Sequence, residues 1–593
     1  MQEDDRNRDI DIAAIQQRYA EERRKRLRAE GAGQYQKMTD VFADFDKDPH
    51  GDPNFTRAPV TEDVDVLIFG GGFGGMLAAG HLREAGIESL RIVEKGADFG
   101  GTWYWNRYPG AASDVESYIY LPMLEELGYV PSEKYAKGPE IFAHCQKFAR
   151  HFGLYERALF QTLVKELRWD ETRSRWIIRT SRDDEIAARF VVSATGLMSS
   201  PKLPGIPGIE SFAGKSFHTS RWDYSYTGGD PRGDMTGLKD KVVGIIGTGS
   251  TSLQCVPHLG NSAKHLYVFQ RTPSTVSVRA NRPTDPEWAK SLKPGWQRER
   301  MRNFTYWAAG IPQDVDLVDD GWTELFGSNV ALNGAKDKTP EEIARQDAVH
   351  MEKIRGRVDA VVQDKATAEA LKPWYNLFCK RFGFHDEFLD TFNRPNVALV
   401  DTAGKGVERI TPAGVVVAGK EYPVDCLIFA TGFDFMTKYT EESGVEMFGR
   451  DGRSLADHWA KGTRTIWGMQ TAGFPNFFLM SQVQAGVTPN YMHTADVQTK
   501  HIAYIIARCM KDGVKAIEPT EEMEQGWVDT ILAAAPARLA FIESCTPSYG
   551  NFEGQRDKAV MLNGVYSGGP TVYLKFLEDW RAEGSMTGMQ LTR

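Results

Sequence analysis

Two glycine-rich turns in this chain have the residue types and the spacing that bind a dinucleotide. The first, Gly70-x-Gly72-x-x-Gly75, follows the apolar segment 63–69 and precedes a helical pattern. Glycine at these positions permits a tight turn and lets the backbone approach a pyrophosphate, whose charge then meets the helix N-terminus. Glu94 closes the next predicted strand, where a carboxylate can accept the ribose hydroxyls of an adenosine. We therefore expect a dinucleotide at this turn.

The second turn, at Gly247 and Gly249, repeats this arrangement with two differences. Its third position is Ser252 instead of glycine, which predicts slightly looser packing of the helix. Where the first unit has an acid, this unit has Arg271 followed by Thr272. A guanidinium and a hydroxyl bind a 2′-phosphate that a carboxylate would repel, so we expect NADPH rather than NADH. The residues expected to contact this coenzyme are Gly247, Thr248, Gly249, Ser250, Arg271 and Thr272.

Between the two turns lies the segment 212–223, FAGKSFHTSRWD. It matches the pattern FxGxxxHxxxW(P/D), and the matching residues are Phe212, Gly214, His218, Trp222 and Asp223. This pattern resembles the fingerprint of the Baeyer-Villiger monooxygenases. The resemblance implies FAD at the first turn and NADPH at the second, joined by the fingerprint segment. It also implies that His218 acts through conformation and hydrogen bonding rather than as a base.

Other segments carry the same resemblance. Residues 100–110 and 114–117 are similar to the flavin-contacting stretch of that family, which implies cofactor contacts from Thr102, Trp103, Asp114 and Tyr120. Residues 379–397 resemble its Lys-Arg segment. The implied roles are a second 2′-phosphate contact for Lys380 and an active-site cation for Arg381, oriented by an ion pair with Asp114.

The resemblance implies an enzyme that uses FAD, NADPH and O2 to convert ketones to esters or lactones through a C4a-peroxyflavin. Segments 132–136, 484–490 and 545–554 look like the branch that acts on large cyclic ketones such as cyclopentadecanone. Two alternatives stay open. One is a flavin-dependent N- or S-hydroxylating monooxygenase, and the other is a non-catalytic flavin-binding redox sensor.

The predicted fold is α/β, with two Rossmann-like dinucleotide-binding domains. Residues 1–60 form an N-terminal helical extension that packs on the body of the protein. Residues 61–210 together with 390–593 form a discontinuous FAD domain, and residues 211–389 form the NADPH domain, with a helical insertion at about 285–375.

Two Ala-Thr-Gly turns, at 194–196 and 430–432, each follow an apolar segment, and we expect both to return the chain to the first nucleotide unit. The six cysteines are scattered without a CxxC pair. We therefore expect no disulfide framework, no structural zinc or other metal site, and no dithiol redox centre.

The composition is that of a globular protein, with 41% hydrophobic and 25% charged residues among 593. A net charge of −9 gives no attraction to nucleic acid or acidic lipid. The basic run 23–28 is surrounded by acidic residues, so we interpret it as a solvated helix face. No membrane span or signal peptide is apparent, and we expect a cytoplasmic enzyme whose partners are a small-molecule ketone, bulky or large and cyclic, and O2.

Overall fold

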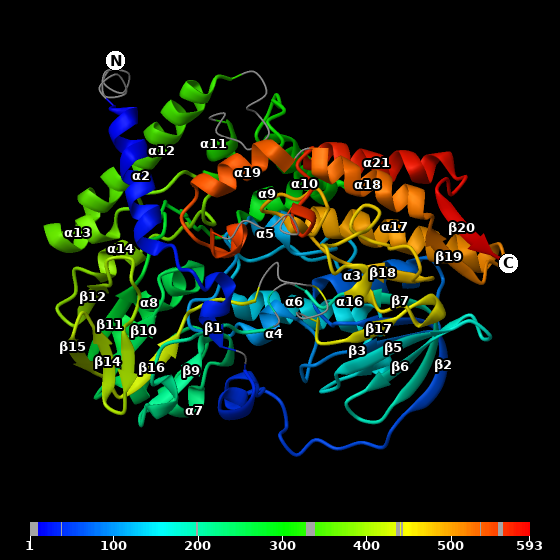
Figure 1. Cartoon of the computed structure of the whole chain (residues 1–593), viewed down its shortest axis with the longest axis horizontal. Coiled ribbons are helices and arrows are strands. Elements are labelled where there is room, and N and C mark those ends of the chain that lie inside the picture. Colours follow the sequence, from blue (N-terminus) through cyan, green and yellow to red (C-terminus); the bar gives the residue numbers. More distant parts are fainter. Residues whose placement is uncertain are drawn as a thin grey trace.

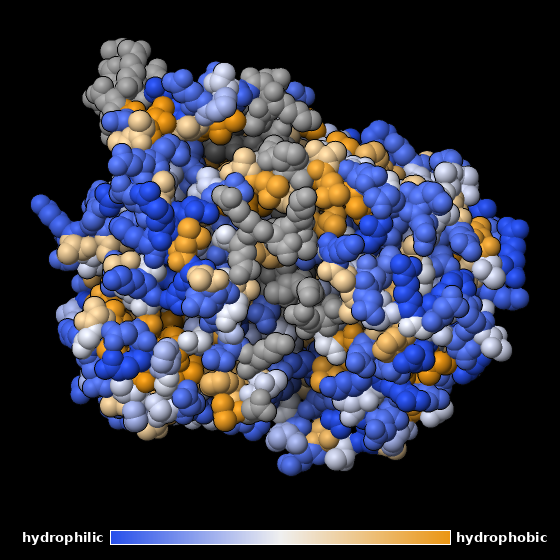
Figure 2. All heavy atoms as spheres, in the orientation of Figure 1, coloured by the Kyte–Doolittle hydropathy of each residue, from blue (hydrophilic) through white to orange (hydrophobic). Residues whose placement is uncertain are grey.

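A computed structural model describes all residues except 1–9, 37, 197, 199, 328–337, 435–438, 440–442, 534 and 555–560. Two β-sheets stand side by side with helices packed around and above them (Figure 1). The face shown in Figure 2 is largely hydrophilic, in keeping with the 25% of charged residues. None of the described helices is both long enough and apolar enough to cross a membrane.

The first sheet contains β2 (Thr61–Phe69), which leads directly into the first glycine turn. Along β2, Val66 and Ile68 pack into one hydrophobic cluster and Leu67 and Phe69 into another, so the strand is buried on both faces as parallel strands usually are. Its strand order is β17 (Glu446–Phe448), β5 (Val164–Asp170), β6 (Arg175–Thr180), β7 (Glu185–Ser193), β2 (Thr61–Phe69), β3 (Leu90–Val93) and β4 (Ala158–Leu159), with β18 (Phe477–Leu479) paired to β7.

The second sheet has five strands, and every pairing in it is parallel. Its order is β12 (Val397–Asp401), β11 (His265–Gln270), β10 (Val242–Ile246), β16 (Cys426–Phe429) and β9 (Lys215–His218). A separate antiparallel sheet consists of β13 (Arg409–Thr411), β14 (Gly414–Val417) and β15 (Lys420–Pro423). Two pairs of short strands complete the set: β1 (Tyr35–Gln36) with β8 (Leu203–Pro204), and β19 (Ala516–Pro519) with β20 (Met589–Thr592).

Helices follow each glycine turn, as the sequence predicts. These are α3 (Phe73–Glu84) after β2 and α8 (Ser250–Ser262) after β10. The predicted insertion is helical in its described part, with α9 (Pro286–Ser291), α10 (Trp296–Ala308), α11 (Gly321–Leu325), α12 (Pro340–Val361) and α13 (Lys365–Leu371). The other longer helices are α6 (Gly138–His151), α17 (Tyr491–Lys511), α18 (Glu521–Ala533), α19 (Ala535–Ser544) and α21 (Pro570–Glu583). One-turn helices are α4 (Thr102–Trp105), α5 (Ser117–Tyr120), α7 (Tyr224–Thr227), α14 (Phe388–Thr391) and α16 (Leu455–His458).

The N-terminal extension packs on the body of the protein, as predicted. Its helix α2 (Ile12–Arg26) lies beside α12 in Figure 1. Ile15 and Tyr19 are buried against Ala348, and the Arg18 guanidinium lies over the ring of Trp374. After the helix, β1 pairs with β8, which fixes the extension to the loop between the two sheets.

The structure corrects the expected path of the chain after residue 390. Strand β16, which leads into the Ala-Thr-Gly turn 430–432, pairs with β10 and β9 in the second sheet, and β12 pairs with β11. Sheet membership therefore places β12 and β16 with the second unit, not with the first as the boundary at 390 implied. The prediction failed because strand pairing is a non-local property that the residues of the strand do not encode.

The sequence analysis expected no disulfide framework and did not identify the one disulfide that the structure contains. Cys379 and Cys545, separated by 166 residues, form a disulfide. The remaining cysteines, Cys145, Cys255, Cys426 and Cys509, are free and buried. Spacing along the chain indicates disulfides only when paired cysteines recur in a dense pattern, and this single long-range pair has none.

Candidate active site

A single continuous cavity of ≈ 1600 Å³ is lined by both glycine turns and by the segments that follow residues 377 and 547. All but one of the predicted catalytic and cofactor-binding residues line it. They are Gly70, Gly72, Glu94, Thr102, Trp103, Asp114, Tyr120, Gly247, Thr248, Gly249, Ser250, Arg271, Thr272, Lys380 and Arg381. Gly75 and the fingerprint residues are not among the lining residues.

The first turn requires glycine for close packing. Gly70 has a φ of +108°, and a Cβ there would lie 2.2 Å from the carbonyl oxygen of Ala194. At Gly75 a Cβ would lie 1.9 Å from the carbonyl oxygen of Gly70. Glu94 is buried, accepts hydrogen bonds from the backbone N–H groups of Gly71 and Gly96, and lines the cavity. Burial raises the pKa of Glu94, although the two N–H donors oppose that shift.

The second turn has the same construction. Gly247 has a φ of +112°, and a Cβ there would lie 2.4 Å from the carbonyl oxygen of Ala430. A Cβ on Gly249 would meet no atom within 4 Å, so the backbone at this position opens directly onto the cavity. Ser252 does not loosen the packing as predicted, because it is fully buried and its hydroxyl donates to the Gly247 carbonyl over 2.7 Å.

These contacts show that each Ala-Thr-Gly turn belongs to a different unit. Ala194 packs against Gly70 and Ala430 packs against Gly247. Each Ala-Thr-Gly turn therefore packs against the glycine turn of its own sheet. The expectation that both return to the first unit is correct for 194–196 and wrong for 430–432.

Arg381 and Asp114 form a two-pronged ion pair inside the cavity. Nε and one terminal nitrogen of Arg381 donate to the two carboxylate oxygens of Asp114, over 3.2 and 2.6 Å. Burial alone would lower the pKa of Arg381, but the Asp114 carboxylate raises it above its usual value. The Arg381 side chain is 35% accessible, so its fixed positive charge can meet a ligand in the cavity.

Trp322, in α11, holds this ion pair in place. Its indole N–H donates to the backbone carbonyl of Asp114 over 2.8 Å, and its ring centroid lies 5.6 Å from the guanidinium carbon of Arg381. The sequence analysis did not identify Trp322, because nothing in the pattern of the insertion distinguishes this tryptophan from a core residue.

Arg271 and Lys380 both line the cavity and lie close enough for their charges to interact. Arg271 donates to the Gln34 side-chain oxygen over 2.8 Å and forms an ion pair with Glu553 at 3.4 Å. Lys380 donates to the carbonyl oxygen of Pro547 over 3.0 Å. Burial, followed by repulsion from Arg271, lowers the pKa of Lys380 to about 7. Gln34 and Glu553 are further residues of this site that the sequence analysis missed.

The fingerprint residues build the edge of the second sheet. Gly214 is required there, because a Cβ would lie 2.6 Å from the Asp425 carbonyl oxygen. His218 is fully buried at the end of β9, and burial together with Arg221 lowers its pKa to about 3, so it is a neutral imidazole. Trp222 donates from its indole to the Thr227 hydroxyl over 3.1 Å. The remaining two contribute packing and a helix cap: Phe212 packs against a hydrophobic cluster, and Asp223 accepts from the backbone of Tyr226 at the start of α7.

Arg221, inside the fingerprint, connects this segment to the first unit. Its guanidinium carbon lies 4.0 Å from the centroid of the Trp105 ring, and Trp105 lines the cavity. The adjacent Tyr224 hydroxyl donates to the carbonyl oxygen of Arg107. The fingerprint segment therefore contacts the stretch that the sequence assigned to the flavin. Arg221 escaped the sequence analysis because it occupies an unspecified position of the pattern.

The site combines two dinucleotide-binding turns, a shared cavity and an ion pair with a fixed cation, which is the construction of an oxidoreductase that binds two dinucleotides. Comparison with known proteins supports this class. A family model described as pyridine nucleotide-disulphide oxidoreductase matches residues 67–231. Neopentalenolactone D synthase of Streptomyces avermitilis is 52% identical over 98% of this chain and 99% of its own. The Baeyer-Villiger monooxygenase ATR8 of Stachybotrys chlorohalonatus is 48% identical over 98% and 95%.

Among solved structures, the polycyclic ketone monooxygenase of Thermothelomyces thermophila aligns with a TM-score of 0.92 and 39% identity, covering 98% of this chain and 99% of that one. The chain is an FAD- and NADPH-dependent flavoprotein monooxygenase. Within that class it belongs to the Baeyer-Villiger monooxygenases, which use O2 to convert ketones to esters or lactones.

The residues present fit both cofactors. At the first turn the backbone of Gly72 and the buried Glu94 line the cavity, which suits the pyrophosphate and ribose of FAD. At the second turn the open face of Gly249 suits the coenzyme pyrophosphate, and Arg271 suits a 2′-phosphate.

Proposed function

We propose that the substrate is a bulky, polycyclic ketone. The observation that carries this proposal is an apolar wall of the cavity, built from three separate parts of the chain. Ala308, Trp322 and Phe326 from the insertion and Phe378 just before the disulfide lie in or against one hydrophobic cluster, in which Trp322 contacts the Arg381–Asp114 ion pair. Val487, in the loop before α17, and Met492, in the first turn of α17, also line the cavity. Such a wall suits a large hydrocarbon skeleton and excludes water from the reacting carbonyl.

The same proposal assigns roles to four of the cavity residues. The bound flavin supplies activated oxygen once NADPH has reduced it. Arg381 places a permanent positive charge where negative charge develops on the ketone oxygen, and Asp114 orients that charge. Trp103 and Tyr120 are joined by a hydrogen bond of 3.1 Å and would form part of the flavin wall.

A panel of ketones tests the substrate class. We expect a tetracyclic ketone to give a kcat/KM about tenfold or more above that of cyclohexanone, because each buried methylene contributes about 0.8 kcal/mol. Mass spectrometry should show the gain of one oxygen and the fragmentation of an ester. Conversion of small rings alone would contradict the proposal. An N-hydroxylated product from a matched amine, without ester from any ketone, would favour the N-hydroxylating alternative.

Lys380 gives a pH dependence to coenzyme binding. A doubly charged 2′-phosphate binds the protonated ammonium, and in this protein the pKa of Lys380 lies at about 7. Binding above that pH must therefore take up a proton. We expect the dissociation constant of NADP⁺ to be flat just below pH 7 and to rise toward about tenfold per pH unit above it.

The range from about pH 7 to about pH 9 suits this measurement, because the phosphate itself titrates near about 6. Titration of the flavin absorbance with NADP⁺ gives the constant at each pH. The Lys380→Met variant should bind more weakly and lose the dependence. A Lys380→Met variant that binds NADP⁺ as tightly as the wild type at about pH 7 would rule out Lys380 as a phosphate contact.

A further inference from the structure

The N-terminal extension reaches the cavity near Arg271, and three of its residues, Arg28, Gln34 and Tyr35, line that cavity. They come from the segment that runs from the end of α2 into β1, before either glycine turn in the sequence. Of the three, Gln34 contacts Arg271, which follows β11.

The extension forms hydrogen bonds with the turn that contains Arg271. Arg26, at the end of α2, is buried, and its Nε donates to the Arg271 carbonyl and to the Thr272 hydroxyl, each over 3.1 Å. The Arg271 guanidinium in turn donates to the Gln34 side chain over 2.8 Å. The backbone and the side chain of Arg271 are thus both fixed by the extension.

Tyr35 is linked to Arg271 through the carboxylate of Glu553. Its hydroxyl donates to Glu553 over 3.0 Å, and Glu553 forms the ion pair with Arg271. Lys202 Nζ lies 3.7 Å from the centroid of the Tyr35 ring. Pairing of β1 with β8 holds Tyr35 opposite Pro204, so the position of the ring is set by the backbone.

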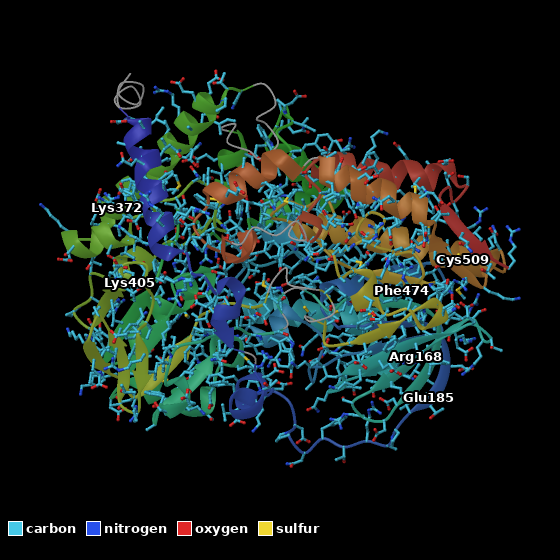
Figure 3. All side chains as sticks on the ribbon, in the orientation of Figure 1. Arg168, Glu185, Lys372, Lys405, Phe474 and Cys509 are labelled. Atoms are coloured by element: carbon cyan, nitrogen blue, oxygen red, sulfur yellow. A yellow bond between two sulfur atoms is a disulfide. The ribbon has the colours of Figure 1, made fainter. Side chains whose placement is uncertain are left out.

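Arg28 adds a cation near Arg271. Its guanidinium donates to the carbonyl oxygen of Lys405, a residue labelled in Figure 3 close to the end of α2. Arg28 and Arg271 approach the same glycine: a Cβ on Gly406 would lie 2.8 Å from the Arg28 guanidinium nitrogen and 3.9 Å from Arg271 Cδ. Arg28 is exposed and borders the cavity, so its charge is accessible to an anion there.

We propose that residues 26–35 form one wall of the NADPH site, with Arg28 as a further contact to the 2′-phosphate and Gln34 as a positioning residue for Arg271. This inference rests on the proposed assignment of Arg271 and Lys380 to that phosphate. It gives the extension a binding function: NADPH recognition draws on the N-terminal segment as well as on the second sheet.

The test is the affinity of the FAD-loaded, full-length protein for NADP⁺, NAD⁺ and adenosine 2′,5′-bisphosphate at low ionic strength. In Arg28→Gln we expect NADP⁺ and the bisphosphate to bind about five- to tenfold more weakly, a modest factor because the exposed charge is partly screened. NAD⁺, which lacks the phosphate, should bind as in the wild type. Gln34→Leu should likewise reduce the preference for NADP⁺ over NAD⁺.

Arg24→Gln is the matched control. Arg24 is exposed on α2, four residues before Arg28, and carries the same charge, but it is not among the cavity-lining residues. Its variant should bind all three ligands within about twofold of the wild type. Wild-type affinities in both Arg28→Gln and Gln34→Leu would overturn the inference, as would an equal loss of NAD⁺ in Arg28→Gln. A wild-type protein that does not prefer NADP⁺ to NAD⁺ would instead overturn the underlying assignment of Arg271.

Discussion

Replacing Arg381 with alanine is expected to abolish ester formation while FAD stays bound and NADPH is still oxidised slowly. Arg381 is the cation that lines the cavity beside Asp114, and its charge is fixed because a guanidinium does not deprotonate at working pH. Loss of one preorganised charge donor costs about 2.7 to 4 kcal/mol, or about a hundred- to a thousandfold in rate. The ester yield per NADPH consumed, with the visible spectrum as a measure of bound FAD, checks this result.

Two further variants separate charge from geometry at this position. Arg381→Lys keeps the positive charge but cannot make both contacts with Asp114, so it should retain a small part of the activity. Asp114→Asn keeps the shape of the partner but removes its charge, and it should reduce ester yield less than Arg381→Ala does. If Arg381→Ala forms ester at the wild-type rate, the guanidinium has no part in the reaction.

The parts of this site that could be predicted from the sequence are those that local backbone geometry dictates. Gly70 and Gly247 stand where φ is positive and a Cβ would meet a carbonyl oxygen, so their glycines carry a signal that is visible in the sequence itself. The exchange of Glu94 in the first unit for Arg271 in the second is equally visible, because each follows its strand at a fixed distance.

The parts that could not be predicted depend on contacts between distant segments. The bond from Trp322 to the Asp114 carbonyl spans 208 residues, and that from Gln34 to Arg271 spans 237. Neither tryptophan nor glutamine at those positions differs from an ordinary core or surface residue until the chain is folded. Strand β16 was assigned to the wrong unit for the same reason, since its apolar residues suit the interior of either sheet.

The disulfide was the most consequential of these omissions, because it lies next to Arg381, the proposed active-site cation. Cys379 directly precedes Lys380 and Arg381, and Cys545 anchors the segment that closes the cavity. The two segments are also joined by hydrogen bonds, from the Ser548 hydroxyl to the Cys379 carbonyl over 3.0 Å and from Lys380 to the Pro547 carbonyl over 3.0 Å. The turn that carries Arg381 and the C-terminal segment therefore behave as one unit.

Replacing Cys545 with serine should consequently lower the free energy of unfolding and the fraction of consumed NADPH that yields ester. Loss of a native disulfide costs about 2 to 4 kcal/mol, since the cross-link no longer restricts the unfolded chain. Loosening of the Arg381 turn should also raise the share of NADPH that yields hydrogen peroxide instead of ester. The thermal unfolding midpoint and the peroxide yield, measured with and without a reductant, check both effects.

The reductant provides the internal control, because it should lower the midpoint of the wild type to that of Cys545→Ser and leave the variant unchanged. Denatured, unreduced wild type should expose four free thiols out of the six cysteines in the chain. Six titratable thiols, or a wild-type midpoint that does not respond to reductant, would show that the bond does not support the fold. With the bond absent and ester yield unaltered, the hydrogen bonds from Ser548 and Lys380 would suffice to hold Arg381 in place.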